Sequence, residues 1–349
     1  MPGSTQAMTL PDVFTRYRGQ IDAGLQQALA GREGALYDML RYHLGWQDEH
    51  GAPNRVGGGK GVRPALCLFG AEVLGGKQAA ALPAAIALEL VHNFSLIHDD
   101  IQDGDTERHH RSTVWYIWGH GNGIDAGVAM HGLANLALTM VKGAALPAVK
   151  QLEISQLITR ASLQMIEGQV LDITYEQRPT VRVNDYLTMI EKKTGALLEA
   201  PLHAGAVIAT DDPKQVQAMR AFGHELGRLF QIRDDMLGVW GEPAKTGKAA
   251  GNDIHRRKKS LPIVHALSTA EGEARERLTQ VYKSDRPLTP VDVAEVTSVL
   301  DEIGTRRFCE ELAKEHAASS LAAIRDLELA PSARRECEEL TRFLLERDF

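Results

Sequence analysis

Apolar residues recur at spacings of three and four along almost the whole chain, and strict alternation of apolar and polar residues is almost absent. The first pattern predicts amphipathic helices, whereas alternation would have indicated strands. Glycine and proline mark most of the breaks between apolar segments. We therefore predict an all-α protein, with helices over about 11–30, 33–46, 64–75, 82–103, 122–142, 147–176, 183–210 and 213–240 and further helices from 260 onward.

Several residues predict details of these helices. Asp212, Thr289 and Ser332 each stand where a helix is expected to begin, and their side chains suit N-terminal caps. Pro201 lies inside the helix predicted over 183–210 and should kink it, because proline cannot donate the backbone hydrogen bond. The kink would free backbone carbonyls near Leu197.

No repeat, low-complexity tract or linker divides the chain. A chain of 349 residues is long enough for two domains, but the uniform helical pattern favours one. We predict a flexible N-terminus over 1–10 and a single domain over 11–349.

Composition narrows the classes of function. Hydrophobic residues make up 44% and charged residues 24%, as in globular proteins. A net charge of −7 argues against nucleic acid as the main partner. Three widely spaced cysteines fit neither a disulfide framework nor a zinc site, and they indicate a reducing, cytoplasmic setting. No signal-peptide pattern opens the sequence and no run of 18 apolar residues occurs, so no transmembrane segment is expected.

A first group of carboxylates closes the helix predicted over 82–103. Asp99 and Asp103 would lie one helical turn apart, separated by about 40° around the axis, with Asp100 between them. Like charges at this spacing destabilise an isolated helix by a few tenths of a kcal/mol. Paired oxygen ligands suit Mg²⁺, which keeps waters and shares substrate phosphates. A solvated helix end is the alternative, and this stretch alone leaves both open.

A second pair, Asp234 and Asp235, closes another apolar helical run farther along the chain. Two such pairs can face each other across a cavity and hold several metal ions. That arrangement suits chemistry on diphosphates, because metal ions stabilise the charge on a departing diphosphate.

Basic loops accompany both acidic groups. The first contains a glycine triplet that permits close backbone approach to a ligand, the second follows the first acidic group and includes adjacent histidines, and the third follows the second acidic group. Each can bind phosphate or be an ordinary basic loop that pairs with nearby aspartates. A metal site on the adjacent histidines is disfavoured, since such residues are usually exposed polar side chains. The basic residues of these loops include Lys60, Arg63, Arg108, His109, Lys248 and Lys258.

With these motifs together, the chain resembles the trans-isoprenyl diphosphate synthases, also called the polyprenyl synthetase family. The resemblance spans about 55–265 and rests on six motifs in matching order: Gly-Gly-Lys-Gly-Val-Arg-Pro, Asp-Asp-Ile-Gln-Asp, Gly-Gln-x-x-Asp, Lys-Thr, Phe-Gln-x-x-Asp-Asp, and Gly-Lys followed by Asp-x-x-x-x-Lys. It implies an all-α isoprenoid-synthase helical bundle around a central active-site cavity, and usually a homodimer.

The resemblance also implies roles for individual residues. Three Mg²⁺ ions would be bound by Asp99, Asp103 and Asp234. The allylic diphosphate would be held by Arg108, Lys193, Gln231, Lys248 and Lys258, with Asp253 nearby. Isopentenyl diphosphate would be bound by Lys60, Arg63, His92 and His109. Thr194 would act near the reacting carbons. The catalytic set is therefore Asp99, Asp103, Arg108, Lys193, Thr194, Asp234 and Lys248.

The activity so implied is that of a Mg²⁺-dependent prenyltransferase, which condenses isopentenyl diphosphate with an allylic diphosphate through an allylic carbocation. The released diphosphate can take the proton, so no side-chain base is required. Phe94, five residues before Asp99, would block the growing chain below the metals. In the family, an aromatic residue at this position accompanies products of 15 to 20 carbons. We therefore predict a C20 product, with a C15 product as the second candidate. Plain core packing is the alternative role for Phe94.

Three positions depart from the family pattern. Gly238 stands where many members have a third aspartate, His109 where a second arginine is usual, and Gly61 where a basic residue is common. The last two weaken the isopentenyl site and suggest an alternative, a class I terpene synthase that cyclises a prenyl diphosphate without condensation. A non-catalytic subunit is disfavoured because the first acidic motif is whole. Condensation is favoured by the basic residues retained at the isopentenyl site, Lys60, Arg63 and His92.

Overall fold

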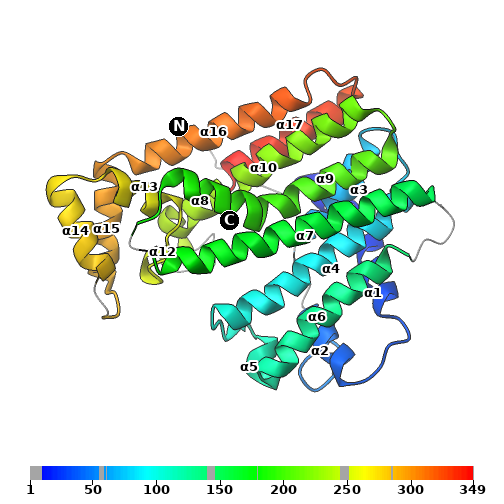
Figure 1. Ribbon diagram of the computed structural model, residues 1–349, viewed down its shortest axis with the longest axis horizontal. Helices are drawn as coiled ribbons and strands as arrows, with labels where there is room; N and C mark the ends of the chain where they lie inside the picture. The colour runs from blue at the N-terminus through cyan, green and yellow to red at the C-terminus, as the bar shows by residue number, and fades with distance from the viewer. Residues whose placement is uncertain are drawn as a thin grey trace, which may run out of the picture. The chain divides into compact units, whose positions relative to one another are not determined.

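The structure is a computed structural model that describes residues 10–54, 59, 61–139, 146–178, 180–243, 251–283 and 286–348. Helices make up nearly all of its regular structure, and the described residues add one two-stranded sheet (Figure 1). The prediction of an all-α protein is confirmed. The expectation of a flexible segment over 1–10 falls outside the described residues, except for Leu10.

The chain forms two compact units. The N-terminal unit is defined here as Pro11–Ser162 with Ala200–Met219, and the C-terminal unit as Leu163–Glu199 with Arg220–Phe349. Three long helices have residues in both units: α7 (Ala148–Glu176), α9 (Ala196–Ala209) and α10 (Pro213–Trp240). This division does not test the prediction of a single domain over 11–349, which stays a prediction.

The N-terminal unit is built around α4, whose residues on all sides are buried among the neighbouring helices. Small residues let helices approach closely. A Cβ atom at Gly70 would fall 3.1 Å from the Leu202 backbone, and one at Gly205 would fall 2.4 Å from the Cys67 backbone oxygen. The elements are η1 (Asp12–Phe14), α1 (Arg18–Leu29), α2 (Ala35–His43), α3 (Val62–Glu72), α4 (Gln78–Gln102), β1 (Glu107–Arg108), β2 (Arg111–Ser112), α5 (Val114–Trp118) and α6 (His120–Ala137).

By length and composition, α4 is also the described helix that meets the criteria for a membrane span, with a mean hydropathy of 1.5 over 18 residues. However, 72% of that window is buried inside the protein. A buried core helix meets the same criteria, so α4 is weak evidence for a membrane span.

The C-terminal unit has a compact end in which α12 and α13 pack against α14 and α15. Ile254 of α12 is fully buried there, with apolar partners from α10, α13 and α15. The elements are α8 (Val183–Ile190), η2 (Glu191–Gly195), α12 (Asn252–His255), α13 (Leu261–Thr269), α14 (Gly272–Lys283), α15 (Pro290–Glu302), α16 (Thr305–Ala323) and α17 (Pro331–Glu346).

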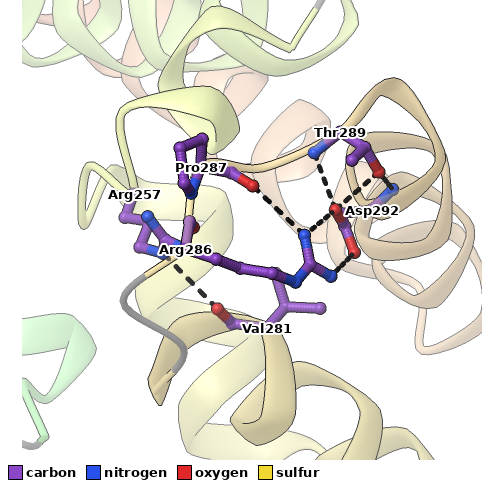
Figure 2. A network of polar contacts seen from close by, with 6 residues as sticks. All are labelled: Arg257, Val281, Arg286, Pro287, Thr289 and Asp292. Carbon is purple, nitrogen blue, oxygen red and sulfur yellow. Dashed lines mark hydrogen bonds and ion pairs between the residues drawn. The ribbon is translucent and has the colours of Figure 1, made fainter.

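A network of charged and capping side chains fixes the start of α15, as Figure 2 shows. Thr289 caps the helix through a capping box with Asp292, which confirms the predicted cap. Arg286 donates to both carboxylate oxygens of Asp292, at 2.7 and 2.6 Å, and these bonds hold the pKa of that carboxyl below its usual range. Arg257, from the turn after α12, donates to the backbone oxygens of Val281, at 3.4 Å, and of Arg286.

The other predicted details had mixed outcomes. Asp212 caps α10, since its carboxylate accepts a hydrogen bond from the Lys214 backbone at 2.9 Å. The predicted cap at Ser332 is wrong: α17 begins at Pro331, and its N-cap is Ala330. Pro201 lies inside α9, and the kink predicted there stays a prediction; the π-helical turn η2 comes before it. An inserted residue in this helical turn re-aims the side chains of η2.

Candidate active site

The first acidic motif stands at the C-terminal end of α4 in the N-terminal unit. Asp99 is half-buried and Asp103, the C-cap residue, is exposed, whereas Asp100 is only 2% exposed. The helical period explains this difference, because consecutive residues point about 100° apart and residues four apart share a face. Asp99 and Asp103 thus share the more open face, while Asp100 points into the protein.

Asp100 is paired with Arg108 of the β1–β2 hairpin. The guanidinium donates to one Asp100 carboxylate oxygen from Nε at 2.8 Å and from Nη2 at 2.7 Å. Burial raises the pKa of Asp100, and the hydrogen bonds and charge of Arg108 oppose that rise. Arg108 was predicted to bind the allylic diphosphate; here its position is set by an inward-facing aspartate, and 28% of its side chain remains exposed.

The hairpin that carries Arg108 was expected to be a loop. Glu107 pairs with Ser112 and Arg108 with Arg111, so His109 and His110 form a two-residue turn. Their φ angles are +51° and +61°, the left-handed region that few side chains adopt. The two positive φ angles match a type I′ turn, which suits the twist of a hairpin. His109 is held in this strained conformation and is exposed.

Three residues predicted to bind isopentenyl diphosphate lie in one positively charged neighbourhood. Burial holds the pKa of His92 well below its usual value, and the charges of Arg63, Arg108 and His109 lower it further. His92 is therefore a neutral imidazole near pH 7 that can donate from one nitrogen and accept at the other. Burial also lowers the pKa of Arg63 to about 10. Lys60, the fourth predicted residue, lies outside the described residues.

Sequence reasoning missed Glu89, which lies one turn before His92 on α4. Its side chain is 8% exposed, and it is the carboxylate whose charge supports the protonated form of Arg63. Asn93 donates to its backbone oxygen at 2.8 Å and to its Oε1 at 3.4 Å. Burial raises the pKa of Glu89. A single acid inside an otherwise apolar helical run was the available signal, because such a residue must find a cationic or hydrogen-bonding partner.

Phe94 is 8% exposed and packs within the N-terminal unit between α4 and α6. Its ring lies edge-on to His98, with centroids 5.1 Å apart, and to His131, with centroids 5.2 Å apart. His98 in turn lies against Gly127, where a Cβ atom would approach its ring to 2.2 Å. The position of Phe94 is therefore set by an aromatic group that spans both helices.

The second acidic motif lies on α10 in the C-terminal unit. Asp234 is half-buried, whereas Asp235 is 1% exposed. Asp235 accepts hydrogen bonds from the Tyr186 hydroxyl at 2.6 Å, the Leu261 backbone at 3.1 Å and the Gln231 amide at 2.8 Å. Burial raises its pKa to about 6. Asp235 thus joins α8, α10 and α13, which leaves Asp234 as the metal-ligand candidate of this pair.

Gln231 links this motif to Thr194. Its Nε2 donates to Asp235, and its Oε1 accepts from the Thr194 hydroxyl at 2.7 Å. Thr194 therefore presents its hydroxyl oxygen in a fixed direction, on the π-helical turn η2. Gln231 was predicted to bind the allylic diphosphate; the structure shows it orienting two other side chains.

Lys193, also on η2, forms an ion pair with Asp172 of α7. The two helices touch at Gly168, where a Cβ atom would fall 2.2 Å from the Lys193 backbone nitrogen. Glycine is required there for α7 to approach η2 so closely. The Gly-Gln-x-x-Asp motif therefore does two things, since Gly168 admits η2 and Asp172 orients the Lys193 ammonium.

Lys258 follows α12 and lies among four carboxylates. Burial lowers its pKa, but the charges of Asp253, Asp235, Asp172 and Asp234 outweigh burial and raise that pKa above its usual value. The ammonium is therefore charged at every physiological pH. Lys258 was predicted to bind a diphosphate. In the structure its ammonium group lies among acidic residues of the C-terminal unit. Lys248, predicted for the same role, lies outside the described residues.

Sequence reasoning found no chemistry after residue 260, and the structure corrects this at Arg347. Its side chain is 8% exposed, and its Nη2 lies 3.4 Å from Asp234 Oδ1 and donates to the Phe230 backbone oxygen at 3.0 Å. Arg233 donates to the Arg347 backbone oxygen at 2.9 Å. No sequence signal marked this arginine, because its partners lie more than a hundred residues earlier in the chain.

The partly open carboxylates of each unit suit magnesium. Within the described ranges, no group of three or more His, Cys, Asp or Glu side chains is close enough to hold a metal ion. Asp99, Asp103 and Asp234 supply carboxylate oxygens at partly open positions, which is how Mg²⁺ is bound together with waters and substrate phosphates.

Comparison with known proteins agrees with this chemistry. The polyprenyl synthetase family matches residues 50–302. A geranylgeranyl diphosphate synthase of Mycobacterium tuberculosis is 37% identical over 345 residues, which cover 96% of this chain and 97% of that protein. A (2E,6E)-farnesyl diphosphate synthase of the same species is 34% identical over 315 residues, covering 88% of this chain and 85% of that protein.

Solved structures that are similar to this chain are also prenyl diphosphate synthases. A polyprenyl synthetase from Streptomyces coelicolor A3(2) is similar with a TM-score of 0.89 and 36% identity, covering 95% of this chain and 98% of that one. A geranylgeranyl pyrophosphate synthetase from Pyrococcus horikoshii has a TM-score of 0.86 and 32% identity, covering 96% and 98%. These relatives are synthases, which favours condensation over the terpene synthase alternative. The chain belongs to the polyprenyl synthetase family and is a prenyltransferase that makes short-chain isoprenyl diphosphates.

Proposed function

We propose that the protein condenses isopentenyl diphosphate with an allylic diphosphate to give the C20 product geranylgeranyl diphosphate. The C15 product, farnesyl diphosphate, is the second candidate. The observation that carries this proposal is Phe94, a buried ring on α4 five residues, or about 1.4 turns, before Asp99. A rigid ring held by His98 and His131 suits a barrier to chain growth. The 37% identity with a geranylgeranyl diphosphate synthase over nearly the whole chain supports the same length.

The proposed cofactor is Mg²⁺, three ions in each active site, with Asp99, Asp103 and Asp234 as protein ligands. The exposure of these three side chains supports this assignment, as does the inward position of Asp100 and Asp235. Magnesium, when bound, would stabilise the negative charge that builds up on the departing diphosphate. The basic side chains of Arg108, Lys193 and Lys258 would hold the same diphosphate from the protein side.

The second substrate would be bound by the basic neighbourhood of the N-terminal unit. Arg63 supplies a charged fork for the isopentenyl diphosphate, and neutral His92 can donate one hydrogen bond to it. Glu89 keeps Arg63 charged despite its burial. When the allylic diphosphate loses its diphosphate, a positive charge forms on the allylic carbons. The Thr194 hydroxyl oxygen would face this charge, because Gln231 fixes its direction. Proton loss needs no side-chain base, since the released diphosphate accepts the proton.

We further propose a homodimer. The part of α7 in the C-terminal unit exposes an apolar stripe at spacings of three and four, formed by Leu163, Ile166, Val170 and Ile173. In the N-terminal unit, α6 exposes Ile124, Val128 and Leu136. Exposed apolar surface of this extent marks an association site, and a second copy of the chain is the proposed occupant. Light scattering after gel filtration should give twice the chain mass; a monomer would contradict the proposal.

The proposed product is tested with Mg²⁺, farnesyl diphosphate and labelled isopentenyl diphosphate, with products analysed after phosphatase treatment. Label should enter a C20 alcohol, and Phe94→Ala should shift the label toward longer alcohols because the barrier is gone. Phe308→Ala, which removes the same ring from α16, is the matched control and should leave product length unchanged. A Phe94→Ala enzyme with the native product distribution would show that Phe94 is only a core residue.

A further inference from the structure

The last residue of α2 is a histidine, His43, that no sequence motif marked. Its neighbour Tyr42 attaches this end of the helix to the β1–β2 hairpin. The Tyr42 hydroxyl donates to the Ser112 backbone oxygen at 2.8 Å, and Arg111 donates to the Tyr42 backbone oxygen at 2.8 Å. The Arg111 guanidinium also lies over the Tyr42 ring, 4.0 Å from its centroid. The end of α2 is thus held against the hairpin that carries Arg108.

His43 is hydrogen-bonded to Asn93 of α4, and the surroundings of Asn93 show which group donates. Asn93 Nδ2 already donates to Glu89, to the backbone oxygen at 2.8 Å and to Oε1 at 3.4 Å. The bond between His43 and Asn93 raises the pKa of the imidazole, as a bond donated by the ring does. One ring nitrogen of His43 therefore carries a hydrogen and donates to the Asn93 amide oxygen. In a neutral imidazole the other nitrogen carries none.

The charged groups that act most strongly on His43 are cationic. Arg108 and His109 act from the first strand and the turn of the hairpin, and Arg111 acts from the second strand. Burial, and then these charges, lower the pKa of His43 to about 3. His92 of α4 is the neighbouring imidazole, since the charge of His43 lowers its pKa as well. The helices α5 and α6 also pack against α2, and their titratable side chains are not among these leading groups: Tyr116, His120, Asp125 and His131.

Two acids belong to this neighbourhood, and each already has a cation as its partner. Glu89 supports the charge of Arg63, and Asp100 accepts from Arg108. Arg63 Nε is buried and makes no hydrogen bond to any residue that the structure describes. His43 is half-buried, so its ring keeps surface that a ligand can reach. Cations and unused donors are therefore in excess here, which suits an anion such as a diphosphate.

We propose that His43 is a further binding residue for the isopentenyl diphosphate, and that its second ring nitrogen takes up a proton from the solvent when the diphosphate binds. This role rests on the proposed isopentenyl site of Arg63 and His92. A phosphate oxygen accepts a hydrogen bond only from a nitrogen that carries a hydrogen, and the charge of the diphosphate stabilises the imidazolium. The imidazolium would supply the positive charge that is missing where His109 replaces the usual second arginine.

Calorimetric titration with isopentenyl diphosphate, in two buffers of different ionisation enthalpy, measures the protons taken up on binding. It is run without Mg²⁺, because the allylic site is proposed to need the metal. At about pH 8 the terminal phosphate, with a pKa of about 6, has already lost its proton. The native protein should take up protons from the buffer. His43→Gln keeps a donor for Asn93 but cannot be protonated, so it should lose the uptake that belongs to His43 and bind about 10–100-fold more weakly, as expected for a lost hydrogen bond from a charged group.

The matched control is His50→Gln, the same change at a histidine in the loop after α2 whose side chain is 82% exposed. It should bind isopentenyl diphosphate like the native protein, with the same proton uptake. Thermal unfolding without ligand checks that both variants are folded. The native protein gives a second measurement that needs no variant: its affinity should fall as pH rises above about 7.5, by about tenfold per pH unit for one full proton.

The outcomes separate this role of His43 from the site itself. Unchanged proton uptake in His43→Gln, with strong loss of binding in Arg63→Met, would overturn the inference and leave the proposed isopentenyl site intact. A native affinity that does not change with pH would overturn it in the same way. Unchanged binding in Arg63→Met would overturn the proposed isopentenyl site and this inference with it.

Discussion

Each acidic motif contains its own Asp-Asp pair. The two pairs are alike in which aspartate is buried, but they differ in what binds the buried one. In both, the first aspartate is half-buried and the second is buried, at 2% exposure for Asp100 and 1% for Asp235. Asp100 is neutralised by an ion pair with Arg108. Asp235 is instead held by three hydrogen bonds and lies near Lys258.

This difference shows that the buried aspartates organise their units by different means. In the N-terminal unit an ion pair attaches a short hairpin to the end of α4. In the C-terminal unit, hydrogen bonds to Asp235 join three helices. The nearby cation, Lys258, interacts with several carboxylates and is not paired with Asp235 alone. The outward aspartates have the same proposed role in both motifs, so variants at paired positions separate the chemical role from the structural one.

The largest expected effect is on turnover when an outward aspartate is removed. Asp99→Ala and Asp234→Ala should each lower kcat by at least about 10²–10³-fold, the cost of removing one group that stabilises the leaving charge. Thermal unfolding without Mg²⁺ should change little in Asp99→Ala, because that side chain is partly exposed. It should fall further in Asp234→Ala, because the buried Arg347 guanidinium loses its carboxylate partner. Steady-state kinetics and calorimetry on the same preparations measure both. Retained turnover in either variant would remove that residue from the metal site.

The next effect is on stability when an inward aspartate is changed. Asp100→Asn should lower the free energy of unfolding by about 3 kcal/mol, at the low end for a broken buried pair because Arg108 is 28% exposed. Asp235→Asn should cost about 1–3 kcal/mol, since its donors lose a charged acceptor but keep an amide oxygen.

Urea unfolding of both variants ranks these two costs. A larger loss for Asp235→Asn than for Asp100→Asn would contradict this order and mean that the hydrogen-bonded aspartate contributes more to stability than the ion-paired one.

The histidines of the two units should give pH dependences of opposite sign. Burial lowers the pKa of His43 to about 3, so the folded protein binds fewer protons than the unfolded chain between about pH 6.5 and 3, and stability falls as pH falls through that window. The hydrogen bond to Glu199 raises the pKa of His224, so its contribution is complete below the unfolded pKa and is lost as pH rises through the folded value.

Urea midpoints for the native protein, His43→Gln and His224→Gln at several pH values between 5 and 8 test this prediction. His43→Gln should reduce the loss of stability at acid pH, and His224→Gln should reduce the loss at alkaline pH. Equal pH profiles for all three proteins would mean that neither ring contributes.

The smallest effect is expected at His109, the turn residue beside Arg108. His109→Arg should lower KM for isopentenyl diphosphate by a few-fold, because a full charge joins Arg63 and His92. KM for the allylic substrate should stay the same and is the internal control. Unchanged KM for isopentenyl diphosphate would place His109 outside that site.

Much of the fold followed from the sequence because helix formation is local. Apolar spacing located most of the helices, and short-range chemistry located the caps at Asp212 and Thr289. Sequence reasoning failed where the deciding contact was not local. The cap predicted at Ser332 was displaced when α17 began at Pro331, and no sequence pattern indicated the π-helical turn η2, which packs against Gly168.

The sequence by itself determined the helical class, the diphosphate chemistry of the two acidic motifs and the family of the chain, because each depends on residue types at short spacings. Only the tertiary structure decided which aspartate of each pair faces inward, that Arg347 reaches Asp234, and that Asp253 occupies the space at Gly238. These features depend on contacts between segments far apart in the chain, and no local pattern encodes the distance between such segments.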